Sequence, residues 1–182
     1  MIRQNDKIMN TRTGQIMIFR KTGADTKEEL LEIECFNPKS NEREPLHIHP
    51  KQESYCEVIS GRLHFLIDGK EIILEPGEHL TIASGIPHCF WNEDEDEAHH
   101  IQRFVPALNI AGFFDTFFAL SRDGKLNKNG IPNLFHASII ILAHKDEIRL
   151  ANPPWALQYL AYSVLAAIGK LMGYCAEYHT KT

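Results

Sequence analysis

The sequence predicts a mostly β fold, a closed or double-sheet β-barrel, followed by a helical C-terminal segment. Between residues 15 and 105, short runs of β-forming residues recur, and glycine or proline turns bound most of them. This pattern is typical of barrels and double-sheet folds. After Pro106 the apolar residues take helical spacing, which predicts helices. We therefore expect a β-barrel with an N-terminal arm over residues 1–106 and a helical appendage over residues 107–182.

Composition narrows the class of protein. A chain of 182 residues with 43% hydrophobic residues is long enough for one globular domain with an appendage. Nineteen basic and 24 acidic side chains give a net charge of −5, so nucleic-acid binding is not expected. The N-terminus has no apolar stretch of the kind found in secretory signals. The four cysteines form no C-x-x-C pair, which favours reduced thiols and a cytoplasmic location.

The expected strands follow one another through short turns. Residues 1–13 are polar and expected to form an arm, and residues 23–26 are expected to form a turn. The expected strands cover residues 15–20, 29–36, 47–49, 55–59, 62–67, 71–74, 79–82 and 99–105, and a further strand starts at residues 90–91. Asp68-Gly69 predicts a hairpin turn, because glycine accepts a positive φ. The acidic run Glu93–Glu97 predicts a solvated loop.

Three helices are expected in the C-terminal segment. Asn109 is a candidate N-cap for the first, whose phenylalanines between residues 113 and 118 form an apolar stripe. We expect this stripe to cover an open end of the barrel or a partner chain. The second helix is expected over residues 134–150, with the isoleucines 139–141 buried and residues 145–147 solvated.

The third helix is expected over residues 155–174. The stretch 150–169 carries no charged residue and is long enough to span a bilayer. Pro153-Pro154 and several polar residues interrupt it, which favours a packed helix or a helix buried in a homodimer. Contact with a membrane surface is the alternative.

Three histidines in the predicted barrel are candidate metal ligands. His47 and His49 are two residues apart in an extended segment, so both side chains point to the same face. His88 follows a turn further along the chain. Neutral imidazole is the commonest metal ligand, and three imidazoles suit a divalent first-row metal such as Fe, Mn, Ni or Zn. The spacing alone does not select one of these metals.

The stretch from Pro45 to Asn92 resembles the cupin superfamily. The family's second motif, G-x5-P-x-G-x2-H-x3-N, is matched by Gly77, Gly85, His88 and Asn92, with Ala83 in place of proline. Of the first motif, G-x5-H-x-H-x(3,4)-E-x6-G, the matching residues are His47, His49 and Gly61. The resemblance implies a double-stranded β-helix, or jelly-roll barrel, of the RmlC-like type. It also implies a metal held by the three histidines.

The carboxylate ligand of the family's first motif is displaced in this chain. Six residues before Gly61 stands Ser54, whereas Glu53 satisfies the shorter spacing after His49. If the strand keeps the family's register, Ser54 faces inward and Glu53 outward, because a shift of one residue changes the face. A local bulge would bring Glu53 inward. Glu53 therefore stays a candidate fourth ligand.

Other histidines and cysteines have simpler interpretations. His64 and His79 are expected at a pocket wall or the surface, and His99 and His100 are expected on opposite faces of one strand. Cys56 and Cys89 are expected as small buried side chains. Candidates for the apolar lining of the barrel are Phe65, Ile67, Leu80, Ile82 and Phe90.

Three functions remain open from the sequence. The first is a metal-dependent enzyme of dioxygenase or isomerase type that acts on a small organic ligand. The second is a non-catalytic binding or sensing barrel that has lost the glutamate ligand. The third is a protein held at a membrane surface by its last helix. The sequence nominates no catalytic residue and no organic cofactor, and we expect a homodimer.

Overall fold

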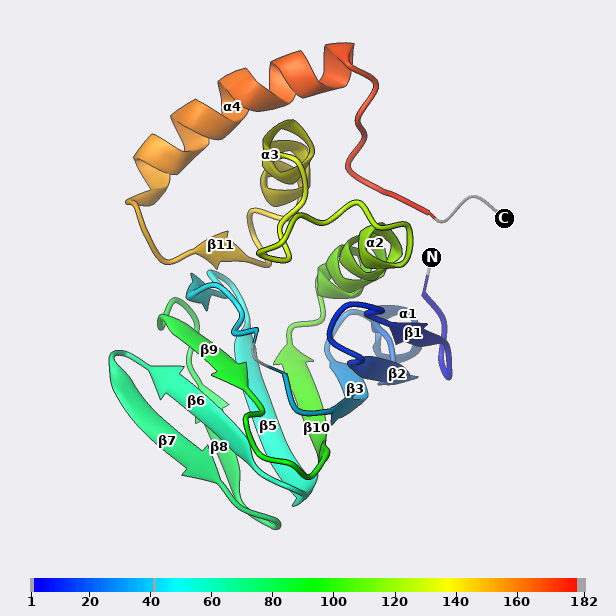
Figure 1. Cartoon of the computed structure of the whole chain (residues 1–182), viewed down its shortest axis with the longest axis vertical. Coiled ribbons are helices and arrows are strands. Elements are labelled where there is room, and N and C mark those ends of the chain that lie inside the picture. Colours follow the sequence, from blue (N-terminus) through cyan, green and yellow to red (C-terminus); the bar gives the residue numbers. More distant parts are fainter. Residues whose placement is uncertain (1, 41, 180–182) are drawn as a thin grey trace.

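The computed structural model describes residues 2–40 and 42–179. Two antiparallel sheets face each other and form a barrel, and three helices lie over one end of it (Figure 1). In order across the first sheet, the strands are β1 (Lys7–Met9), β2 (Ile16–Lys21), β3 (Leu31–Asn37), β10 (Ala98–Val105), β5 (Glu53–Ser60) and β8 (His79–Ile82). The second sheet contains β11 (Arg149–Leu150), β4 (His47–Ile48), β9 (His88–Trp91), β6 (Leu63–Ile67) and β7 (Lys70–Leu74).

The strands alternate between the core and the surface, as half-buried strands do. In β3, Leu31, Ile33 and Cys35 are buried. Glu32 and Glu34, which alternate with them, form ion pairs with arginines of the neighbouring strands on the outer face. The barrel core contains Val58 and Ile82 of the first sheet and Leu63, Phe65 and Phe90 of the second. Apolar burial between the two sheets therefore holds the barrel together.

The helices are α1 (Gly23–Thr26), α2 (Ile110–Arg122), α3 (Leu134–Ala143) and α4 (Trp155–Leu171). Helix α2 follows Asn109 directly and packs Ile110 and Phe118 into the core shared with β2, β3 and β10. Helices α3 and α4 pack closely at Gly169, where an added Cβ would lie 3.0 Å from Ile139 Cδ1. The predicted mostly β fold, a double-sheet barrel followed by C-terminal helices, is confirmed.

Several local predictions differ from the structure. The helix expected over residues 134–150 ends at Ala143, because residues 149–150 form strand β11 instead and pair with β4. Glu147 is buried rather than solvated. The expected arm contains β1, which pairs with β2, and the expected turn at residues 23–26 closes into the single helical turn α1.

Helix α4 packs against α3 on one side only. Leu157, Leu160, Val164, Ile168 and Leu171 are exposed on its other side. Within residues 2–40 and 42–179, no helix combines the length and hydropathy that a membrane span requires. The expected homodimer stays a prediction.

Candidate metal centre

The fold brings the three predicted histidines together. His47 lies on β4 and pairs directly with His88 on β9, while His49 follows β4 immediately. The ring centroids of His47 and His88 are 4.5 Å apart, and those of His49 lie 5.1 Å and 5.2 Å from the other two. One ligand nitrogen from each ring lies within 4.8 Å of the others. All three side chains are buried.

A backbone carbonyl fixes the orientation of each ring. His47 Nδ1 donates to Pro45 O at 2.9 Å and His88 Nδ1 donates to Ile86 O at 2.8 Å. His49 Nδ1 donates to Glu147 O at 2.6 Å. Because a carbonyl only accepts, each Nδ1 must carry the proton, and the neutral ring then has an unprotonated Nε2. This is the arrangement that orients histidine ligands in metal sites.

Burial also keeps these imidazoles neutral. Desolvation lowers the pKa of His47 well below its usual value, with the neighbouring His49 and His88 adding to the effect. Desolvation and the nearby His88 lower the pKa of His49 to about 4. The pKa of His88 is lowered by burial as well. At neutral pH the centre therefore presents three uncharged nitrogen donors, which suit a divalent first-row metal ion.

Glu53 is not part of this cluster. Its side chain is exposed, whereas Ser54 is buried beside the barrel interior. The pairing of β5 with β10 is continuous through both residues, so no bulge turns Glu53 inward. The strand keeps the register that puts Ser54 on the inner face.

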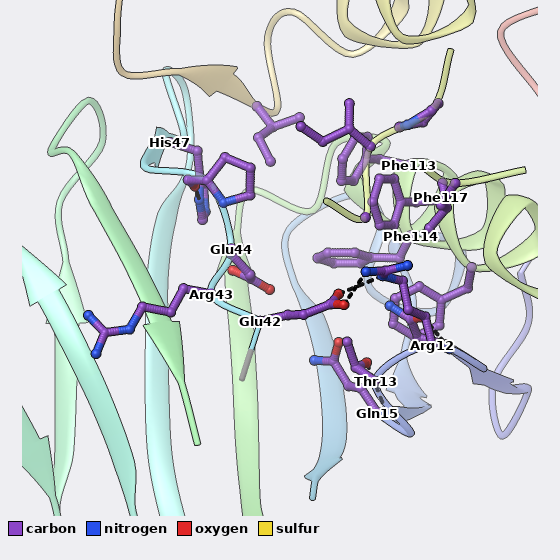
Figure 2. A pocket seen from close by; sticks show the side chains of 18 of the residues that line it. Arg12, Thr13, Gln15, Glu42, Arg43, Glu44, His47, Phe113, Phe114 and Phe117 are labelled. Atoms are coloured by element: carbon purple, nitrogen blue, oxygen red, sulfur yellow. Dashed lines mark hydrogen bonds and ion pairs between the residues drawn. The ribbon is translucent and has the colours of Figure 1, made fainter. Parts of the chain in front are cut away.

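A cavity of about 440 Å³ opens beside the histidines, between the barrel end and the helices. Its walls include His47 and His49, the α2 rings of Phe113, Phe114 and Phe117, and Tyr162 of α4 (Figure 2). Of the expected lining residues, Phe90 lines this cavity, and Phe65, Leu80 and Ile82 surround only a void of about 10 Å³ inside the barrel. The helices, rather than the strands alone, build the pocket.

Residues 34–101 match the family model described as Cupin domain. The fold agrees with two solved structures, each at a TM-score of 0.50. An RmlC-like cupin from Shewanella frigidimarina NCIMB 400 is 17% identical, with coverage of 61% of this chain and 93% of that one. KdgF from a Halomonas species is 14% identical, with coverage of 60% and 94%. Residues 34–101 therefore form a cupin domain.

Three proteins with named activities are similar to this cupin. An oxidoreductase of Arthrobotrys oligospora is 26% identical over 151 residues, which cover 75% of this chain and 58% of the relative. The probable oxidoreductase virH of Hypocrea virens is 27% identical over 147 residues, which cover 74% of this chain and 65% of the relative. Quercetin 2,3-dioxygenase of Bacillus subtilis is 29% identical over 62 residues, which cover 34% of this chain and 18% of the relative. The cupin therefore spans about six tenths of the first two relatives.

Glu44 is a site residue that the sequence analysis did not nominate. It lies three residues before His47 and lines the cavity, with its carboxyl group directed inward (Figure 2). Burial raises the pKa of Glu44 to about 8. A glutamate in a polar loop carries no sequence signal for lining a cavity. Only its position beside the His-x-His segment could have drawn attention to it.

The remaining histidines of the cupin lie outside the metal centre. His64 Nε2 donates a hydrogen bond to Asp94 Oδ2 at 2.9 Å on the outer face, and His79 is exposed. His99 bonds Glu34 outside the barrel, while its neighbour His100 is buried inside. Their predicted placement on opposite faces is confirmed, and so is the burial of Cys56 and Cys89.

Proposed function

We propose that this cupin is a metal-dependent oxidoreductase acting on a small organic substrate. His47, His49 and His88 would hold a divalent Fe, Mn, Ni or Zn ion, and the substrate would occupy the adjoining cavity. The observation that carries the proposal is the carbonyl bonded to each Nδ1. Three rings held in the same tautomer leave three Nε2 lone pairs for one ion.

A metal ion in this centre would supply an electrophile that polarises a substrate oxygen or activates dioxygen. The chain's own residues orient and shield the reactants. The phenylalanines of α2 line the cavity beside His47 and His49 with apolar rings. Ser54 in place of a carboxylate leaves the positive charge of an ion uncompensated, which strengthens its attraction for a substrate oxygen.

The names of the similar proteins support redox chemistry. Two are described as oxidoreductases and the third as a dioxygenase. The matched segment of the first two includes most of this chain but about six tenths of theirs. The reaction type is therefore our proposal for this cupin, together with the site that would perform it.

Metal analysis of protein purified without chelator tests the proposal. We expect about one divalent ion per chain in the wild type and near-complete loss in His47→Ala and His88→Ala. His79→Ala, which replaces an exposed histidine of the same barrel, is the matched control and should retain the ion. Equal metal content in His47→Ala and the wild type would contradict the site.

A second candidate is a cupin that binds a ligand without turnover. The serine in place of the family's glutamate favours it. Absence of metal from both the wild type and His47→Ala, after incubation with each of the four ions, would support this candidate over the enzyme.

A further inference from the structure

Glu44 stands apart from the other charged groups of the cavity. Arg12 Nε donates to Glu42 Oε2 at 2.8 Å, so these two opposite charges satisfy each other. Arg43 points away from the cavity and lies 3.8 Å above the Trp91 ring (Figure 2). No described residue forms a hydrogen bond or ion pair with the Glu44 carboxyl group. Glu44 is therefore available to a ligand.

The surroundings of Glu44 supply no cation that would hold it ionised. The titratable and charged groups around it are the thiols of Cys35 on β3 and Cys89 on β9, the neutral imidazoles of His47 and His49, the Arg12–Glu42 pair, and the phenol of Tyr162 on α4. The thiols are themselves kept protonated, because burial raises the pKa of both. Of the two arginines that line the cavity, Arg12 is paired with Glu42 and Arg43 is paired with Glu93.

The apolar part of the cavity combines aromatic and aliphatic side chains. Phe113, Phe114 and Phe117 form an aromatic wall along one side, and Phe90 belongs to β9. Flat rings pack favourably against aromatic walls, and a volume of about 440 Å³ is within the range of small-molecule pockets. The shape and chemistry suit a planar ring system.

We propose that Glu44 is the polar recognition residue of this cavity, and that the cavity takes uncharged aromatic ligands bearing a carbonyl or hydroxyl oxygen. This inference rests on the proposed function, because it names the substrate class for the same site. Glu44 would donate its carboxyl proton in a hydrogen bond to the ligand oxygen and so turn that oxygen toward a fixed point in the cavity.

The ionisation of Glu44 agrees with this role. With a pKa of about 8, the carboxyl group is mostly protonated at neutral pH and acts as a donor. Above that pH it becomes a carboxylate, which only accepts hydrogen bonds and repels anionic ligands. Carbonyl ligands should therefore bind more weakly as the pH rises, and carboxylate ligands should bind poorly throughout.

Calorimetric titration of the full-length, metal-free protein tests the proposal with two probes that share one ring system. The probes are 2-acetylnaphthalene, which is neutral, and 2-naphthoate, which is anionic. At pH 7 we expect the ketone to bind at least about tenfold more tightly. At about pH 9.5 its affinity should fall about tenfold, the cost of one lost hydrogen bond at a buried group.

Variants of Glu44 identify the group responsible. Glu44→Gln keeps a neutral donor, so its affinity for the ketone should match the wild type at pH 7 and stay the same at pH 9.5. Glu44→Leu should lose about tenfold at both pH values. Glu53→Gln changes an exposed carboxyl group on β5 and should behave as the wild type.

Several results would overturn the inference. These are no measurable binding of the ketone, tighter binding of the carboxylate, or a wild-type affinity that does not change with pH. Loss of metal from Glu44→Gln would also overturn it, because Glu44 would then be a metal ligand. Since the probes are titrated without metal, these failures are distinct from a failure of the His47→Ala test of the metal centre.

Discussion

Burial acts in opposite directions on the two kinds of titratable residue at this site. It removes the proton from an imidazole, and the pKa of His49 is lowered to about 4. It retains the proton on a carboxyl group, and the pKa of Glu44 is raised to about 8. Both groups are uncharged at neutral pH because a charge in this cavity would lose its hydration. The result is a neutral three-histidine cluster beside a neutral hydrogen-bond donor.

This difference predicts how stability depends on pH. Between pH 4.5 and about 8, folded Glu44 keeps a proton that the unfolded chain releases, so the free energy of unfolding falls as pH rises. His49 makes the free energy of unfolding rise with pH, but only below pH 6.5, the pKa of a histidine in the unfolded chain. Between pH 6.5 and 8, the free energy of unfolding of the wild type should therefore fall by about 1–2 kcal/mol more than that of Glu44→Gln.

Urea unfolding of metal-free protein measures this difference. Glu53→Gln is the control, since it removes an exposed carboxyl group and should follow the wild-type pH profile. If the free energy of unfolding changed with pH in the same way in the wild type and in Glu44→Gln, Glu44 would be ionised at neutral pH.

At the scale of elements, close packing of α3 on α4 depends on one glycine. A Cβ at Gly169 would meet Ile139 Cδ1 and the carbonyl oxygen of Phe135, both at 3.0 Å. The backbone oxygen cannot move aside as a flexible side chain does. The two helices must therefore separate if Gly169 gains a bulky side chain.

We expect Gly169→Val to lower the free energy of unfolding by about 1–3 kcal/mol, the usual cost of overpacking. Ala167→Val introduces the same side chain at an exposed position of α4 and should cost under about 1 kcal/mol. Thermal unfolding of both variants measures the difference. Equal losses would mean that helix propensity, not packing, sets the cost.

At the scale of the whole molecule, the C-terminal segment completes the metal centre. Strand β11 pairs Leu150 with His47, and the carbonyl of Glu147 holds His49. The Glu147 side chain in turn accepts a hydrogen bond from Asn109 N at 3.2 Å. The segment is thus joined to both the ligand strand and the start of α2.

Glu147→Ala should loosen this connection and weaken metal binding by about tenfold, the usual effect of losing support behind a ligand. Competition titration with Zn²⁺ measures the affinity, and circular dichroism confirms that the variant is folded. Glu95→Ala, an exposed change in the acidic loop, should leave the affinity unaltered. An unchanged Zn²⁺ affinity in Glu147→Ala would mean that the Glu147 side chain does not support the three histidines.

Local spacing in the sequence was enough to determine the barrel strands and the three histidines. Alternation with a period of two decides which side chains face inward, so His47 and His49 had to share a face. It favoured Ser54 over Glu53 as the inner residue, and the regular register of β5 decided between them. The start of α2 after Asn109 and the start of α4 at Trp155 also follow from local signals, whereas α4 ends at Leu171 and not at the expected residue 174.

Only the tertiary structure decided what depends on contacts between distant segments. The sequence favoured a helix through residues 144–150, but pairing with β4 made an edge strand there and buried Glu147. The cavity arises where α2, α3 and α4 cover the end of the barrel, and that cover is what keeps Glu44 protonated. Burial is a property of the assembled fold, so no local pattern predicts which carboxyl group it will neutralise.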